Sequence, residues 1–157
     1  MICCVLWIPL CRHEMRYDWE TPKDFYEILN KEFHFTLDPC SKIEGNQKIT
    51  YKDNGLAVNW SDHIVFVNPP YDRTLPQWVR KSYFSAQQGA TVVMLLRSGS
   101  TDTAWWHEYI MFSSEIRFIR NRLSFVLDGK PSRANHASLL VIFFPFCTGP
   151  PKIKSML

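Results

Sequence analysis

The sequence has no long hydrophobic run, no low-complexity segment and no internal repeat. A membrane-spanning helix needs about 20 apolar residues. The apolar start from Met1 to Leu10 is too short for that, and it carries neither a leading basic residue nor a small-residue cleavage site. We therefore expect no membrane segment. A chain of 157 residues, 46% of them hydrophobic, favours one globular domain.

The sequence also lacks paired cysteines and the spacing of a metal site. None of its five cysteines forms a C-x-x-C pair, and an odd count that includes the adjacent Cys3 and Cys4 is a poor disulfide framework. His107-Glu108 is not followed by a second histidine at the spacing of zinc proteases. We expect no metal, and a reducing compartment such as the cytoplasm.

The net charge of +3 permits a nucleic-acid partner without demanding one. The distribution of charge is more informative, because residues 116–133 contain five basic residues and one acidic residue, Asp128. The five are Arg117, Arg120, Arg122, Lys130 and Arg133. Two interpretations stay open: a solvated strand-loop-strand face, or an edge that contacts phosphates.

Hydrophobic periodicity predicts helices that alternate with strands. Helices are expected over residues 23–33, 75–88 and 101–112, with Thr101 or Asp102 as the N-cap of the third. Strands are expected over residues 35–37, 48–51, 64–67, 91–96, 116–119, 123–127 and 138–144. This order indicates an α/β fold with a mostly parallel sheet, an antiparallel end and helices on both faces. We expect a domain over 17–145, an uninformative extension over 1–16 and a tail over 146–157.

Asn68-Pro69-Pro70-Tyr71 is the most specific motif. It follows a buried strand directly, and open α/β sheets bind ligands at the carboxyl ends of strands. The prolines form a rigid turn without backbone donors. The Asn68 side chain and the Pro69 carbonyl can then accept both hydrogens of an aromatic amine, while Tyr71 stacks on its ring, a contact worth about 1–3 kcal/mol. The alternative is a proline-rich turn without a catalytic role.

The chain resembles the amino-methyltransferases, whose motif is [DNS]-P-P-[YFW], and more closely the phage-type Dam-like DNA N6-adenine methyltransferases. The resemblance covers roughly residues 17–144 in matching motif order. The motifs are Asp18-Trp19-Glu20-Thr21-Pro22, Phe33-His34-Phe35-Thr36-Leu37-Asp38-Pro39-Cys40, Asn68-Pro69-Pro70-Tyr71, Ser100-Thr101-Asp102-Thr103-Ala104-Trp105-Trp106-His107 and Ile116-Arg117-Phe118-Ile119-Arg120-Asn121-Arg122-Leu123-Ser124-Phe125. The resemblance implies a Rossmann-like class I methyltransferase with a seven-stranded sheet, acting in the cytoplasm of a bacterial host.

The resemblance also implies S-adenosylmethionine as cofactor. Thr21-Pro22 would hold its methionine end, and Asp38-Pro39-Cys40 would form the cofactor-binding turn. Asp53 is the candidate for the ribose hydroxyls on spacing alone. Asp38 and Asp53 could instead be ordinary turn residues.

The implied substrate is double-stranded DNA with the target adenine flipped out of the stack. The candidates for holding the distorted backbone are Arg117, Arg120, Arg122 and Arg133, and Thr101 and Asp102 either contact DNA or only cap a helix. Arg97 and Asn121 depart from the family pattern, which has Pro and Gly at these places. Other acceptors stay open, namely cytosine N4, an RNA base or a protein glutamine, as does a non-catalytic DNA-binding relative. We expect a monomer or a weak homodimer.

Overall fold

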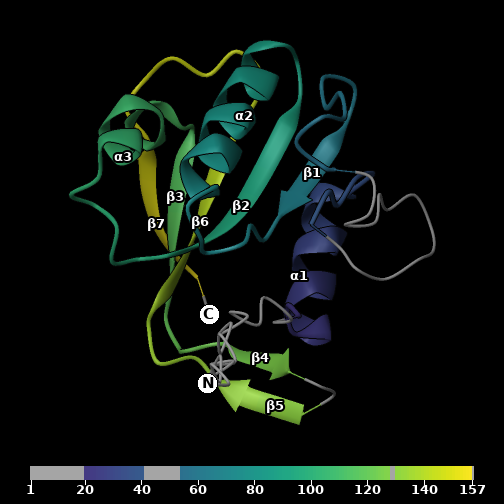
Figure 1. The fold of residues 1–157 in the computed structure, drawn as a ribbon, viewed down its shortest axis with the longest axis vertical. Coiled ribbons are helices and arrows are strands. Elements are labelled where there is room, and N and C mark those ends of the chain that lie inside the picture. Colours follow the sequence, from purple (N-terminus) through teal and green to yellow (C-terminus); the bar gives the residue numbers. More distant parts are fainter. Residues whose placement is uncertain (1–19, 41–53, 128–129, 157) are drawn as a thin grey trace, which may run out of the picture.

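The computed structural model describes residues 20–40, 54–127 and 130–156. Within these ranges the chain forms three α-helices, one short 3₁₀ helix and seven strands (Figure 1). In chain order they are α1 (Lys23–Phe33), β1 (Ile64–Val67), α2 (Leu75–Gln87), β2 (Thr91–Arg97), α3 (Ala104–Glu108), the 3₁₀ helix (Ile110–Phe112), β3 (Glu115–Ile119), β4 (Ser124–Leu127), β5 (Lys130–Arg133), β6 (Ser138–Phe143) and β7 (Lys152–Met156).

The main sheet has five strands in the order β1-β2-β6-β3-β7, and β4 and β5 form a separate two-stranded sheet. β1 pairs with β2 and β3 pairs with β7 in parallel, whereas β6 runs antiparallel to both of its neighbours. The prediction of a mostly parallel, seven-stranded Rossmann-like sheet is therefore wrong. The described residues form a five-stranded sheet of mixed pairing and a small hairpin.

Two features of the chain explain this difference. The strand predicted over 35–37 is reduced to a single bridge between Leu37 and Val65, and the one predicted over 48–51 lies outside the described residues. After β3 the described chain has no crossover helix, and the β4–β5 hairpin returns it directly into β6. Without a crossover, β6 must run antiparallel to β3.

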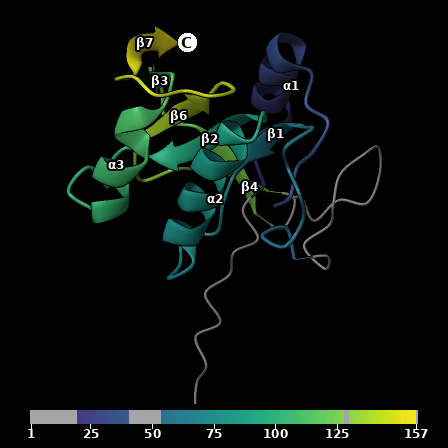
Figure 2. The same ribbon diagram turned by 90° about the horizontal axis from the view of Figure 1, so that it is seen from above.

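The helices lie on opposite sides of the main sheet (Figure 2). Strand side chains alternate between the two faces, so each buried strand contributes to two hydrophobic clusters. On one face α1 packs against the sheet in a cluster that includes Phe25, Leu29, Phe33, Phe66, Val93 and Leu95. On the other face α2 and α3 take part in a cluster that includes Trp78, Val79, Trp106, Val65, Val67 and Met94.

The boundaries of two predicted helices are close to those observed, and the third differs. α1 spans Lys23–Phe33 after Pro22, and α2 spans Leu75–Gln87. The helix expected over 101–112 begins only at Ala104, because Thr103 is extended with a φ of −84° and a ψ of 149°. β7 lies within the segment expected to be a tail and pairs with β3.

The carboxyl ends of three strands lie at the same end of the main sheet. β1, β2 and β3 run in the same direction, so their carboxyl ends lie at the edge where β6 begins, and Arg97 pairs in register with Ser138. Figure 1 shows the β4–β5 hairpin extending from this edge, below the main sheet. Because Asn68 follows β1 and Arg120 follows β3, the fold brings the residues after these strands to the hairpin side of the molecule.

A network of ion pairs joins α1, β3 and β7. The Arg117 guanidinium pairs with Glu115 on the same strand and with Glu32 on α1 at 2.6 Å, and Lys154 pairs with Glu115 at 2.6 Å. Burial raises the pKa of the Glu115 carboxyl, but hydrogen bonds from Lys154 and Arg117 outweigh it and lower the pKa. The hydrogen bond from Arg117 likewise lowers the pKa of Glu32.

We predict that Arg117→Ala lowers the free energy of unfolding by about 3 kcal/mol, since it leaves the nearly buried Glu115 with only one of its two cationic partners. Denaturant unfolding at pH 7 measures this loss. Arg120→Ala, at an exposed arginine, serves as the control and should change stability by less than about 0.5 kcal/mol.

The pH dependence checks the same network. Both carboxyls have pKa values below their usual range, so their contribution is present above the unfolded-state pKa of about 4.3 and is lost as the pH falls through the folded-state pKa. The difference between wild type and Arg117→Ala should shrink over this acidic window. A difference that does not change with pH would contradict the assignment.

Candidate active site

Asn68, the first residue after β1, is fixed by a contact with a distant part of the chain. Its side-chain Nδ2 donates a hydrogen bond to Thr21 Oγ1 at 3.1 Å, across a separation of 47 residues. Among the described residues no hydrogen bond is found to the Asn68 amide oxygen. The bond to Thr21 therefore sets the rotation of the amide and leaves its oxygen available as an acceptor.

Tyr71 is held at the other end of the motif. Its hydroxyl donates to the backbone carbonyl of Leu95 at 3.0 Å. β1 ends in register with Met94, so the tyrosine reaches β2 one residue beyond the pairing of the two strands. Burial raises the pKa of Tyr71, and the nearby Arg97 lowers it by less. The hydroxyl therefore stays protonated at neutral pH and anchors the ring by donating a hydrogen bond.

The predicted cofactor turn lies beside the catalytic motif. The Asp38 side chain is 8% exposed, and its Oδ1 accepts a hydrogen bond from the Cys40 backbone N–H at 3.2 Å. Burial and then the Asp38 carboxylate raise the pKa of the Cys40 thiol, which the Asn68 backbone amide lowers by less. These interactions place the Asp38 turn next to Asn68. They also keep the Cys40 thiol protonated.

Tyr26, on α1, belongs to the same region although sequence reasoning did not single it out. Burial and then the Asp38 carboxylate raise the pKa of its hydroxyl to about 12. The ring also contacts Phe66 of β1 edge to face, with centroids 5.2 Å apart. The sequence could not identify Tyr26 as a neighbour of Asp38, because only the fold places α1 next to the Asp38 turn.

Two further side chains beside Tyr71 were not predicted as site residues. The Arg97 guanidinium carbon lies 4.2 Å from the centre of the Tyr71 ring, and the His136 ring lies 6.4 Å from it. His136 also stacks on Phe125 of β4 at 6.4 Å. The departure of Arg97 from the family pattern was a signal that could have marked this position, whereas nothing in the sequence around His136 does so.

The predicted DNA-binding residues have different surroundings. Arg120, Arg122 and Arg133 are exposed, and so are Thr101 and Asp102 in the turn before α3. Arg117, with 12% of its side chain exposed, is instead part of the ion-pair network. Asp53, the ribose candidate, lies outside the described residues.

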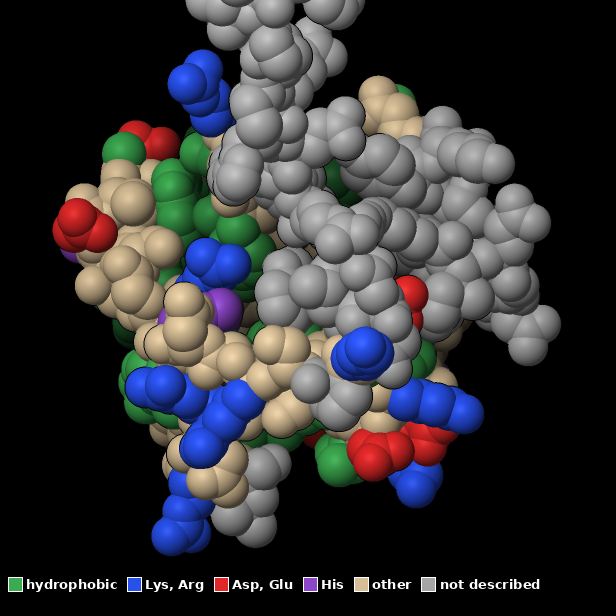
Figure 3. Space-filling model, turned by 60° about the horizontal axis from the view of Figure 1, so that its bottom comes forward, with side chains coloured by type: hydrophobic (Ala, Val, Ile, Leu, Met, Phe, Trp, Pro, Cys, Tyr) green, Lys and Arg blue, Asp and Glu red, His purple; other side chains and the backbone are tan. Residues whose placement is uncertain are grey.

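The basic side chains gather on the face of the molecule that carries the hairpin (Figure 3). Lys130 and Arg133 lie on β5, and Arg122 precedes β4. Glu20 and Val126 of β4 exchange two backbone hydrogen bonds of 2.9 and 3.0 Å. Since Thr21 follows Glu20 directly, the hairpin is attached to the segment that holds Asn68.

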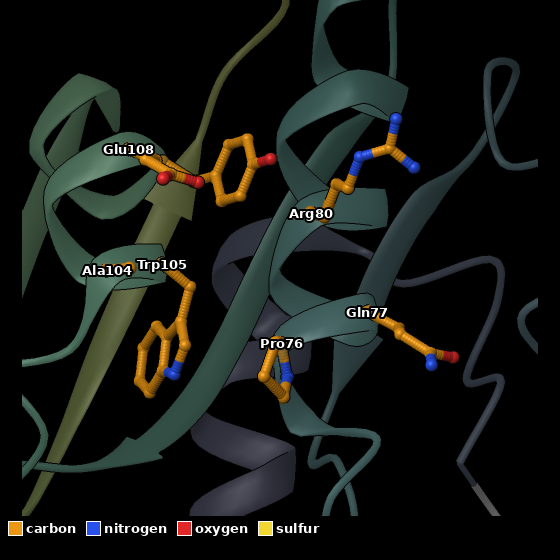
Figure 4. A pocket seen from close by; sticks show the side chains of 7 residues that line it. Pro76, Gln77, Arg80, Ala104, Trp105 and Glu108 are labelled. Atoms are coloured by element: carbon orange, nitrogen blue, oxygen red, sulfur yellow. The ribbon is translucent and has the colours of Figure 1, made fainter.

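A separate depression lies between α2 and α3. It has a volume of about 330 Å³ and is lined by Pro76, Gln77, Arg80, Ala104, Trp105, Glu108 and Tyr109. Figure 4 shows Trp105 of α3 facing Pro76 of α2 across it. None of these residues belongs to the Asn68–Tyr71 motif or to the Asp38 turn, so the depression is distinct from the candidate active site.

The described residues contain no group of three or more His, Cys, Asp and Glu side chains placed to hold a metal ion. In the same part of the chain, no helix has the length and apolar character needed to cross a bilayer.

The Asp38 turn depends on a close contact with Gly55. A Cβ atom on Gly55 would lie 2.3 Å from the Pro39 carbonyl oxygen, which is too close for any side chain. We predict that Gly55→Ala displaces the turn and lowers the midpoint of thermal unfolding by several degrees, the effect of roughly 1–2 kcal/mol in a domain of this size. Gly99→Ala is the matched control, because a Cβ there meets nothing within 4 Å. Equal midpoints for the two variants would refute the contact.

Comparison with known proteins identifies the family of the chain. Residues 10–156 match the family model described as DNA N-6-adenine-methyltransferase (Dam). The chain is also 31% identical over 137 residues to the DNA N-6-adenine-methyltransferase of Haemophilus phage HP1 (strain HP1c1), an alignment that covers 81% of this chain and 78% of that protein. With a family match over nearly its whole length, the chain belongs to the Dam family of DNA N6-adenine methyltransferases.

Proposed function

We propose that the chain transfers a methyl group from S-adenosylmethionine to N6 of adenine in DNA. The observation that carries this proposal is the state of Asn68, whose amide nitrogen is engaged by Thr21 while its oxygen remains an acceptor. This oxygen lies one residue from the buried Pro69, which has a carbonyl and no N–H. A planar NH2 group with two hydrogens to donate fits such a pair of acceptors.

The chemistry follows from the two acceptors. The lone pair of an exocyclic aromatic amine is delocalised into the ring, so the amine is a weak nucleophile. Hydrogen bonds from N6 to the Asn68 oxygen and to the Pro69 carbonyl favour a pyramidal nitrogen whose lone pair can attack. The N–CH3 bond forms as the S–CH3 bond breaks, and one N6 proton then leaves to solvent. The motif contributes alignment and hydrogen bonding, and no ionised base is needed before attack.

The residues around Asn68 fit the methyl donor. When bound, S-adenosylmethionine supplies a sulfonium that carries both the methyl group and its leaving group. A nearly buried carboxylate, such as that of Asp38, is a suitable partner for a positively charged ligand. Thr21, Pro22, Pro39 and Cys40 would form the surrounding wall, and Asp53 remains our proposal for the ribose hydroxyls.

The DNA contacts are proposed for the exposed basic residues of the hairpin region. Arg120, Arg122 and Arg133 can pair with phosphates, whereas Arg117 is already engaged by two carboxylates. Thr101 and Asp102 follow β2 at the same edge and are proposed to contact the DNA near the target base. Unstacking that base costs a few kcal/mol, which these contacts would offset.

We expect Asn68→Ala to lower turnover at least about tenfold, roughly 1.4 kcal/mol of barrier, while affinity for S-adenosylmethionine changes little. Transfer of tritiated methyl groups to DNA measures turnover, and nuclease digestion with mass spectrometry identifies the base. Asn59→Ala, at an exposed asparagine, is the control. Label in cytosine, RNA or protein and not in adenine would replace the proposed acceptor, and DNA binding without any transfer would favour a non-catalytic relative.

Asp38→Asn should instead weaken binding of S-adenosylmethionine by about tenfold or more, because a charge-assisted hydrogen bond is worth about 1.5 kcal/mol or more. Titration calorimetry on the DNA-free protein measures this effect. The control is Asp62→Asn, at an exposed aspartate in the turn before β1. Wild-type affinity in Asp38→Asn would remove Asp38 from the cofactor site.

A further inference from the structure

Arg97 is the last residue of β2 and lies beside the catalytic motif. Leu95, two residues earlier on the strand, accepts the hydrogen bond of the Tyr71 hydroxyl. The Arg97 guanidinium carbon is 4.2 Å from the centre of the Tyr71 ring, a stacking distance. Arg97 is exposed whereas Tyr71 is half-buried. In the DNA-free protein a planar cation therefore lies over the ring of the tyrosine on which the motif predicts that the target base stacks.

The surroundings of Arg97 hold no opposite charge. Among the described residues no carboxylate lies within ion-pair distance of its guanidinium. Its charged and titratable neighbours include His136, whose pKa is lowered by burial and then by the charges of Arg97 and Arg122. An arginine that stacks on an aromatic ring and has no ion-pair partner among the described residues is poised to pair with an anion that approaches this end of the sheet.

We propose that Arg97 is a placeholder for the target base, and that the flipped adenine displaces it from Tyr71 onto a DNA phosphate. This inference rests on the proposed function. Two changes favour the exchange: the base replaces Arg97 on the Tyr71 ring, and Arg97 pairs with a phosphate. Stacking of a base on an aromatic ring is generally stronger than an exposed cation–π contact. The released guanidinium gains a phosphate partner that it lacks in the free protein.

The placeholder has a physical advantage over an empty site. Without Arg97, the Tyr71 ring would lose its cation–π contact. With it, the ring keeps a planar partner of similar thickness to a base, and the contact that is lost on base flipping is replaced at once. Arg97 would thus couple two events, the entry of the base and the clamping of its backbone, through one side chain.

The experiment distinguishes the contribution of the target base to binding from the contribution of the phosphates. Binding is measured as a function of salt for two duplexes of one sequence, which is taken from a methylated site located by sequencing the methylated bases in DNA from cells that express the chain. One duplex carries the target adenine and the other an abasic nucleotide at that position. Both present the same phosphates, but only the first presents a base that can displace Arg97.

For the wild type we expect the adenine duplex to show one more phosphate contact than the abasic duplex. Each contact contributes about 0.9 to the slope of log affinity against log salt, so the ratio of the two affinities should change about 3.5-fold between 50 and 200 mM salt. In Arg97→Ala this ratio should not depend on salt. In Arg97→Lys, whose ammonium stacks less well and is free to reach the phosphate, both duplexes should show the steeper slope.

Arg133→Ala is the matched control, because this arginine is exposed on β5 and lies outside the Tyr71 contact. It should flatten the slopes for both duplexes equally and preserve their ratio. The same salt dependence of the ratio in wild type and Arg97→Ala would overturn the placeholder role while leaving the methyltransferase proposal intact. If the wild type methylates no adenine, the proposed function fails, and this inference fails with it.

Discussion

The hydrogen bond from Asn68 to Thr21 is the constraint on which the candidate site depends. It spans 47 residues and fixes an amide that would otherwise rotate, so that the nitrogen is engaged and the oxygen is presented. Thr21 is held in turn, because its neighbour Glu20 exchanges two backbone hydrogen bonds with Val126. A continuous set of hydrogen bonds therefore runs from the basic hairpin to the catalytic amide. Displacement of the hairpin would be transmitted to Asn68 through only two residues of backbone.

The parts of the fold that could be predicted are those whose signal is local. α1 and α2 have apolar residues at helical spacing, and β1 is a short apolar run ended by two prolines, so their boundaries were close. Strand pairing is not local. β5 reads Lys-Pro-Ser-Arg, which has no strand signal, and it is ordered by pairing with β4. The place of β6 between β2 and β3, and the pairing of β7 with β3, likewise depend on contacts between distant segments, which is why the predicted seven-stranded, mostly parallel sheet was wrong.

The same distinction applies to the site. The family resemblance named Thr21, Asp38 and Asn68 as site residues from their motifs, and the fold places Thr21 and the Asp38 turn beside Asn68. The partners of the charged residues could not be predicted. Arg117 looked equivalent to Arg120 and Arg122 in the sequence, but Glu32 meets it from 85 residues away and removes it from the available basic surface. Counting charge in a segment says nothing about which of its members are already paired.

The architecture also explains how the exposed basic residues of the hairpin come to lie near the Asn68–Tyr71 motif. The carboxyl ends of β1 and β2 supply Asn68 and Arg97, and the β4–β5 hairpin extends from the same edge between β3 and β6. The chain enters β6 from the hairpin, and His136 lies in the short segment between β5 and β6. Its ring contacts Tyr71 of the motif and Phe125 of β4. β6, which lies between β2 and β3, is therefore the strand that joins the basic hairpin to the tyrosine of the motif. In this chain the mixed sheet places the basic hairpin and the Asn68–Tyr71 motif at the same end of its strands.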